Sequence, residues 1–172
     1  MRHRMLPQVW MLFSLLAPTP ALANTIDRLT AVVETELVLA SEERIEAELA
    51  VLDASPTPFW SPDRAAPRQR LVEAAVVRVA AQGLALYQPD DDEVVERRET
   101  VRAQFQRRRE WVAFLSSHGL TEAGLDEVLR RRMVVERFLT RNLDTPLDQV
   151  VAWQQAADRL VLQLQSLSLI HI

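Results

Sequence analysis

Histidine is the side chain most often used as a general base or metal ligand near neutral pH, and the sequence holds three, at positions 3, 118 and 171. We expect His3 and His171 to lie in terminal segments outside the folded domain. His118 stands just before Gly119 at a predicted helix end, where an imidazole complements the negative end of the helix dipole. With one histidine in the domain and no cysteine in the chain, we expect neither a zinc site nor a Ser–His–Asp site, and we predict no cofactor.

Clustered carboxylates are a second possible source of chemistry. The run Asp-Asp-Asp-Glu at positions 90–93 suggests calcium, but it lacks the spaced ligands and central glycine of an EF-hand loop, so helix capping is the better interpretation. Glu34 and Glu36 fall on one face of a predicted strand and bring two carboxylates together, as in some acid–base sites. No neighbouring group would desolvate one of them selectively, so an exposed strand edge is preferred.

The basic side chains are all arginine, which excludes lysine Schiff-base chemistry, and three glycines are too few for a phosphate-binding loop. The dense basic stretches are two arginine runs, at positions 107–109 and 130–132. Three consecutive helical residues spread over about 200° of the helix, so neither run forms a one-sided patch. Solvated helix faces are the preferred interpretation, and contact with an acidic partner is the alternative. The net charge of −4 argues against nucleic acid and anionic membranes as partners.

Large apolar side chains provide the candidate binding surface, although each of them can equally belong to the core. Phe59 and Trp60 stand in a stretch with four prolines between positions 53 and 67, which is built like a surface connection. We therefore expect these two rings to be exposed, since soluble proteins bind unfolded or helical segments through exposed apolar side chains. The candidate binding residues are Phe59, Trp60, Trp111, Phe114, Met133 and Phe138.

The first 23 residues have the pattern of a secretory signal peptide. A basic start and an apolar run at positions 9–17 lead to Ala-Leu-Ala at 21–23, which predicts cleavage before Asn24. An uncleaved anchor is the alternative, but the run is about half of the roughly 20 apolar residues that a membrane span needs. We expect no other membrane-spanning segment. The prediction is an exported protein with a single domain at positions 24–165.

Hydrophobic periodicity assigns the elements that position these side chains. Period-two patterns predict strands at positions 29–33, 37–39 and 160–165. Helical spacing and caps predict helices that begin at Ser41, Pro67, the aspartates 90–92, the apolar set 111–115, Thr121 and the pair Thr145–Pro146. The predicted fold is mainly α (α+β), with about six helices and a small antiparallel sheet formed by the N-terminal strands and the C-terminal strand. Residues 166–172 resemble a translated sequencing-library adapter, and we expect them to lie outside the domain.

Four stretches, taken in order, carry a family resemblance: residues 26–42, 71–84, 90–94 and 114–138. In this order they resemble parts of the N-terminal domain of the SurA family, which comprises periplasmic chaperones and peptidyl-prolyl isomerases. The first three resemble the opening strands with the first helix, the central helix, and the start of the third helix. The fourth stretch is the most specific of the four matches. Residues 152–165 are similar to the family's last helix and strand, which pack onto the N-terminal domain. The resemblance covers nearly the whole chain after position 23.

The family usually carries one or two parvulin-type isomerase domains before its last helix, where this chain has only residues 142–144. Parvulin domains are glycine-rich and carry active-site histidines, so the resemblance implies a protein that is not an enzyme. It implies a periplasmic, ATP-independent chaperone that binds unfolded outer-membrane proteins, or other extended polypeptides, through an apolar groove. The alternative is an envelope adaptor or structural module that binds one folded partner through the same groove or the arginine-rich helices.

Overall fold

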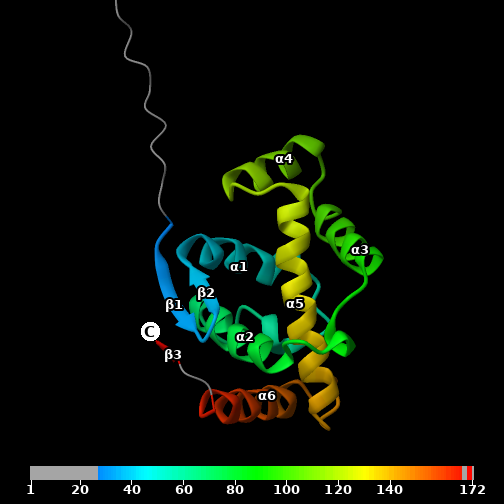
Figure 1. Ribbon diagram of the computed structural model, residues 1–172. Coiled ribbons are helices and arrows are strands. Elements are labelled where there is room, and N and C mark those ends of the chain that lie inside the picture. The colour runs from blue at the N-terminus through cyan, green and yellow to red at the C-terminus, as the bar shows by residue number, and fades with distance from the viewer. Residues whose placement is uncertain (1–26, 168–169, 172) are drawn as a thin grey trace, which may run out of the picture.

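The computed structural model describes residues 27–167 and 170–171, so the predicted signal peptide lies outside the described residues (Figure 1). A hairpin of β1 (Leu29–Val33) and β2 (Glu36–Leu39) leads directly into α1 (Ala40–Leu52). The elements that follow are η1 (Pro58–Trp60), α2 (Pro67–Ala81), η2 (Ala85–Tyr87), α3 (Asp91–Arg102), α4 (Arg108–Ser117), α5 (Glu122–Asn142), α6 (Val150–Gln165) and β3 (Ile170–His171). The predicted mainly helical fold with a small antiparallel sheet is confirmed.

A two-residue turn closes the hairpin. Glu34 has a φ of 51°, in the left-handed region that such a turn between twisted antiparallel strands requires. Ala31 pairs with Val38, and Val33 pairs with Glu36. The apolar side chains of this inner face pack against α2. The sheet order is β2–β1–β3, so β1 is the central strand.

Capping groups begin two helices where the sequence predicts them. Asp90 precedes α3, and its backbone amide donates to Glu93 Oε2 at 2.7 Å. Thr121 precedes α5, and its Oγ1 accepts a hydrogen bond from the Gly124 amide at 3.1 Å. These bonds satisfy amides that a helix start leaves without an intrahelical partner. The capping interpretation of the acidic run at 90–93 is therefore confirmed.

Two other predicted helix starts are wrong by a few residues. α1 begins at Ala40, so Ser41 already lies inside the helix, and its hydroxyl donates to Asp27. α6 begins at Val150, while the Pro146 carbonyl accepts from the Gln149 amide at 3.1 Å in a separate turn. For Ser41, the hydroxyl on which the predicted cap depended is taken by Asp27.

The predicted strand at positions 160–165 is also wrong, because α6 continues to its end at position 165. Trp153, Ala157 and Val161 are buried at four-residue spacing on the inner face of α6, which is the pattern of a helix. The sheet does include a C-terminal strand, but that strand is β3, which lies within residues 166–172. The segment that we expected outside the domain therefore pairs with β1.

The core consists of three clusters arranged around α2 and α5. The first lies between α2, α5, α6 and η1, the second between α1, α3, α4 and α5, and the third between the sheet and α2. Figure 1 shows α5 running the length of the molecule past the other helices. The predicted helix that begins at Pro67 is confirmed as α2, and it is central, because it contacts the sheet, α1, α5 and α6.

Candidate functional site

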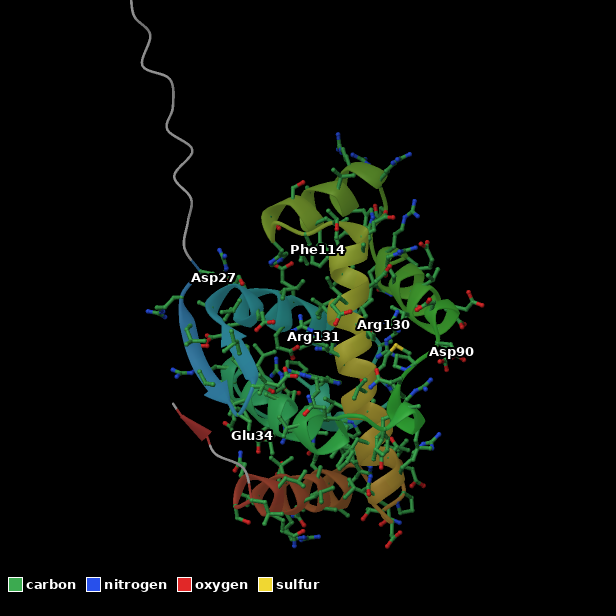
Figure 2. The ribbon with its side chains drawn as sticks, viewed as in Figure 1. Asp27, Glu34, Asp90, Phe114, Arg130 and Arg131 are labelled. Atoms are coloured by element: carbon green, nitrogen blue, oxygen red, sulfur yellow. The ribbon has the colours of Figure 1, made fainter. Side chains whose placement is uncertain are left out.

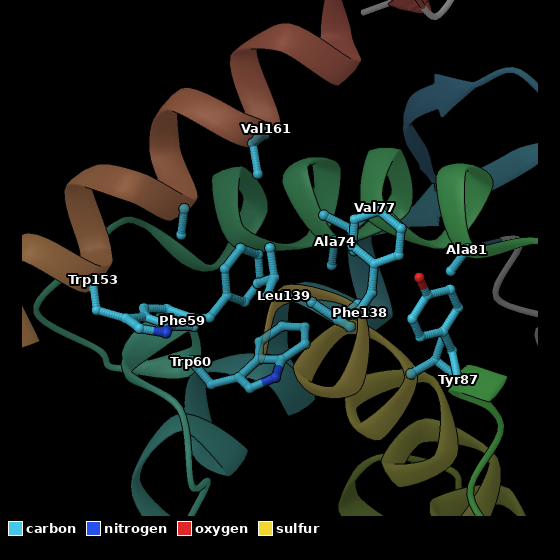
Figure 3. Packing of buried hydrophobic residues seen from close by; sticks show 13 residues of the cluster. Phe59, Trp60, Ala74, Val77, Ala81, Tyr87, Phe138, Leu139, Trp153 and Val161 are labelled. Carbon is cyan, nitrogen blue, oxygen red and sulfur yellow. The ribbon is translucent and has the colours of Figure 1, made fainter. Parts of the chain in front are cut away.

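Three of the six candidate binding residues lie in the first core cluster. Phe59 is 0% and Trp60 is 2% exposed, so the expectation that these rings are exposed is wrong. Their loop folds back as η1 against α6, and the two rings meet edge to face with centroids 4.9 Å apart (Figure 3). Phe138 of α5 belongs to the same buried cluster. The prolines correctly predicted an irregular backbone in this loop. An irregular backbone that prolines stiffen can nevertheless fold over its own side chains and bury them.

The other three candidates lie in or beside the second cluster. Trp111 and Phe114 of α4 are buried, and their ring centroids are 5.8 Å apart. Trp111 Nε1 donates to Glu122 at 3.0 Å, and this bond lowers the pKa of the Glu122 carboxyl. Met133 of α5 is half-buried and lines a depression of about 250 Å³. The six residues are therefore divided between two clusters and do not form one apolar groove.

A chain of buried ion pairs crosses the middle of the domain, and no sequence pattern predicted it. Its charges alternate along the order Arg70, Glu46, Arg132, Asp53, Arg97 and Glu136. We call these six residues the buried ionic chain. The Nε of Arg70 donates to Glu46 at 2.8 Å, and the Nε of Arg132 donates to Asp53 at 3.0 Å. The chain connects α1, α2, α3 and α5, so it holds together elements that are far apart in sequence.

Arg132 and Glu136 each make further contacts that compensate the burial of their charges. The Arg132 side chain is 3% exposed, and its guanidinium lies 4.1 Å from the centroid of the Trp60 ring. Burial raises the pKa of the Glu136 carboxyl, although Arg97 opposes the change and the Ser55 hydroxyl donates to the carboxylate at 2.7 Å. Charges removed from water in this way need their partners, because an unpaired buried charge is strongly unfavourable.

The arginine run at 130–132 is not a solvated face, so the preferred interpretation of it is wrong. Arg130 pairs with Asp91 at 2.6 Å, and Arg131 pairs with Glu42 at 2.9 Å. Arg132 belongs to the buried ionic chain. Figure 2 shows Arg130 and Arg131 on α5. The spread of about 200° over three helical residues explains how one run can pair with four separate carboxylates, those of Asp91, Glu42, Glu46 and Asp53.

The run at 107–109 behaves as the sequence predicts. All three side chains are exposed at the start of α4. Within the described residues none of the three arginines takes part in an ion pair. This run is a solvated basic segment that is open to an acidic partner.

Two remaining candidate groups have structural partners. Glu36 pairs with Arg78 of α2 at 2.8 Å, whereas Glu34 is exposed in the hairpin turn, so the two carboxylates do not form a paired site. His118 follows the last residue of α4, as predicted, and its Nε2 lies 3.2 Å from Glu48 Oε1. These contacts join β2 to α2 and the end of α4 to α1.

An open cleft of about 1010 Å³ lies between the first turns of α1 and α2, the start of β1 and the end of α4. Small or cyclic side chains form part of its surface: Ala40, Ala47, Ala66, Pro67 and Gly119. Charged side chains of both signs form another part, namely Asp27, Arg28, Glu43, Arg44 and Arg68, and Ser41, Ser117 and His118 complete the lining. The volume lies at the upper end of the range for ligand pockets. Sequence reasoning missed this cleft because its lining comes from four separate segments.

Hydrogen bonds fix two sides of the cleft. At the start of β1, Asp27 accepts from the Ser41 amide at 3.2 Å and from the Ser41 hydroxyl, and the hydroxyl bond lowers the pKa of the Asp27 carboxyl (Figure 2). Arg68 of α2 donates to the Thr30 carbonyl at 2.6 Å. Arg28 and Arg44 form no ion pair within residues 27–167 and 170–171. Their guanidiniums are free to donate to carbonyl or carboxylate oxygens of a ligand.

The cleft therefore combines small side chains with charged side chains of both signs. Small side chains let a backbone approach closely, and opposite charges on the walls suit both amides and carbonyls. In the part of the chain that the structure describes, no three acidic or histidine side chains gather as a metal site. No described helix combines the length and the apolar character needed to cross a bilayer. Comparisons with protein-family models, curated proteins and solved structures find no match to this chain.

Proposed function

We propose that the protein is a periplasmic, ATP-independent chaperone of the SurA N-terminal-domain type that holds extended segments of unfolded outer-membrane proteins without isomerase activity. The open cleft over α1 carries the proposal, because it offers about 1010 Å³ of accessible space beside unpaired guanidiniums. The family resemblance of residues 26–138 supports it. The cleft replaces the aromatic groove as the binding surface, since the aromatic rings are buried.

The lining of the cleft suits weak and reversible holding. Ala47 and Ala66 expose little apolar surface, so they do not select one side chain over another. Arg28 and Arg44 add hydrogen bonds to backbone oxygens, which every client sequence has. A dissociation constant in the micromolar range, about 8 kcal/mol, would still allow release to a membrane acceptor.

Aggregation of a client tests the proposal directly. An outer-membrane β-barrel protein is diluted from urea with and without the purified protein, and light scattering follows aggregation. We expect suppression at near-stoichiometric ratios that moderate salt does not abolish. If a demonstrably folded sample suppresses no aggregation at any ratio, the chaperone proposal fails.

Filling the cleft should remove this activity. Ala47 is exposed on α1, so the substitution Ala47→Trp projects an indole into the cleft without entering the core. We expect client affinity to fall about tenfold or more, which corresponds to about 1.4 kcal/mol, with the thermal melt unchanged. The matched control is Ala152→Trp on the exposed side of α6, outside the cleft. Equal affinities of the two variants would show that clients bind elsewhere.

Export of the protein gives a separate prediction. If the first 23 residues are a cleaved signal peptide, protein recovered from the periplasm begins Asn-Thr-Ile-Asp. Intact mass and N-terminal sequencing measure this directly. Replacing Ala23 by arginine should block processing, because signal peptidase requires small residues before the cleavage site. An unprocessed chain that starts at Met1 and stays in the membrane fraction would contradict the prediction.

The exposed arginine run at 107–109 favours a second candidate, an envelope adaptor that binds one acidic, folded partner. Salt distinguishes the two functions. Exposed charges are screened beyond about 8–10 Å at physiological ionic strength, so an adaptor complex should weaken steeply with added salt. Client holding in the cleft should weaken less, because Arg28 and Arg44 donate to neutral backbone oxygens of the client rather than pair with a charge.

A further inference from the structure

The outer edge of β1 is only partly covered. The strand has five residues, and β3 pairs with two of them, in the register Val32 to His171 and Val33 to Ile170. Figure 1 places β3 at the arrowhead end of β1. The start of β1 adjoins the cleft, where Asp27 and Arg28 form part of the lining. A stretch of strand edge therefore connects the cleft to β3.

Hairpin geometry shows which backbone groups face this edge. Val33 and Glu36 flank the two-residue turn and exchange hydrogen bonds across the hairpin. In an antiparallel strand the amide and carbonyl of one residue point to the same side, and those of the next residue point to the other side. The backbone of Val32 therefore faces away from β2, toward β3. Across the hairpin, Leu37 opposes Val32, and its backbone faces the outer edge of β2.

Arg68 gives independent support for this assignment. Its Nη2 donates to the Thr30 carbonyl at 2.6 Å, so that carbonyl also faces away from β2. Arg68 is an exposed residue of the first turn of α2 and lines the cleft as well. Arg68 thus contacts this edge at Thr30, and the two-residue strand β3 pairs with it at Val32 and Val33. The same edge could pair with a longer strand. Proteins protect open sheet edges with charged side chains and short strands in this way.

We propose that the outer edge of β1 accepts an extended segment of a client by antiparallel strand addition, and that β3 and Arg68 are the intramolecular groups which the client displaces. This inference rests on the proposed chaperone function and names its binding mode. The structure itself pairs a short extended segment, Ile170–His171, with this edge in the antiparallel direction. Asp27 and Arg28 of the cleft lining directly precede β1, and a register irregularity between Leu29 and Ala31 lies between them and the paired part of the edge.

The outer face of the hairpin specifies the chemistry of the occupant. Leu29 and Leu37 are 51% and 54% exposed, and Val32 between them is half-buried. An added strand would set alternate side chains beside this apolar face, since side chains in a strand alternate between its two faces. The preferred client is therefore an extended segment with apolar residues at every second position and no proline. Membrane-facing strands of β-barrels have this alternation.

Matched proline substitutions test the proposal, because proline removes one backbone donor. The probe is a fluorescent peptide of about nine alternating valines and threonines, and its control carries a central proline; fluorescence anisotropy measures binding. Ending the chain at Leu169 removes β3 and should tighten binding about threefold. In that chain Val32→Pro should weaken binding about fivefold, and Leu37→Pro, which removes the opposite donor from the β2 edge, should change it less than twofold.

The outcomes separate this inference from the proposed function. If Ala47→Trp abolishes peptide binding while Val32→Pro and Leu37→Pro have equal effects, the cleft binds clients and strand addition is overturned. Loss of binding in Leu37→Pro alone would assign the site to β2 and also overturn the proposal. If the peptide fails to bind and the shortened chain dimerises in sedimentation, the edge takes a second copy instead. A folded protein that neither binds the peptide nor suppresses aggregation would refute both proposals.

Discussion

Replacing Arg132 by methionine should destabilise the protein by about 3–5 kcal/mol, the range seen when one partner of a buried ion pair is removed. Arg132 is 3% exposed and donates to both Glu46 and Asp53 in the buried ionic chain. Methionine fills a similar volume but leaves these two carboxylates facing each other without the charge between them. Urea unfolding followed by far-ultraviolet circular dichroism measures the loss in the free energy of unfolding.

The neighbouring arginine is a matched control. Arg131 pairs with Glu42 nearer the surface, with the two side chains 34% and 19% exposed. Surface ion pairs contribute about 0–1 kcal/mol, so Arg131→Met should have a small effect. A second substitution, Asp53→Asn, should recover part of the stability lost in Arg132→Met, because it removes a buried negative charge while Arg97 keeps Glu136 as its partner. Equal losses in the free energy of unfolding for Arg131→Met and Arg132→Met would show that the buried ionic chain stabilises the fold no more than a surface ion pair does.

The helices were predictable because their signals are local. Thr121 and Asp90 are capping residues that indicate helix starts, and the helical spacing of apolar residues in α5 continues over about six turns. The six residues at 160–165 were mispredicted because so short a run satisfies both a period of two and part of a helical period. The helix that precedes them decides between the two, since Trp153 and Ala157 already place an inner face toward the core.

The buried ionic chain could not be predicted, because its partners are distant in sequence. Arg70 lies 24 residues from Glu46, and Arg132 lies 86 residues from the same carboxylate. A charged residue in the middle of an amphipathic helix is normally solvent-facing, so only the fold reveals that Arg132 points inward. The cleft was missed for the same reason, whereas the exposed run at 107–109 needed no tertiary partner and was predicted correctly.

The burial of Phe59 and Trp60 changes what their substitution will do. Phe59→Ala and Trp60→Ala should each cost about 3–5 kcal/mol, the range for a large aromatic ring removed from a core. Both rings contribute to the cluster between α2, α5 and α6, and Trp60 also supports the guanidinium of Arg132. For a chain of this length the melting temperature should fall by roughly 2–4 °C per kcal/mol, about 10 °C for either variant.

Val112→Ala is the control for this prediction, because Val112 is 51% exposed on α4 and its loss should change stability by less than about 0.5 kcal/mol. Client binding should be compared only at temperatures well below both melts. There, each folded aromatic variant should bind clients like the unmodified protein, since neither ring lies in the cleft. A variant that keeps its melting temperature but loses client affinity would show that the loop opens and that these rings, rather than the cleft, contact the client.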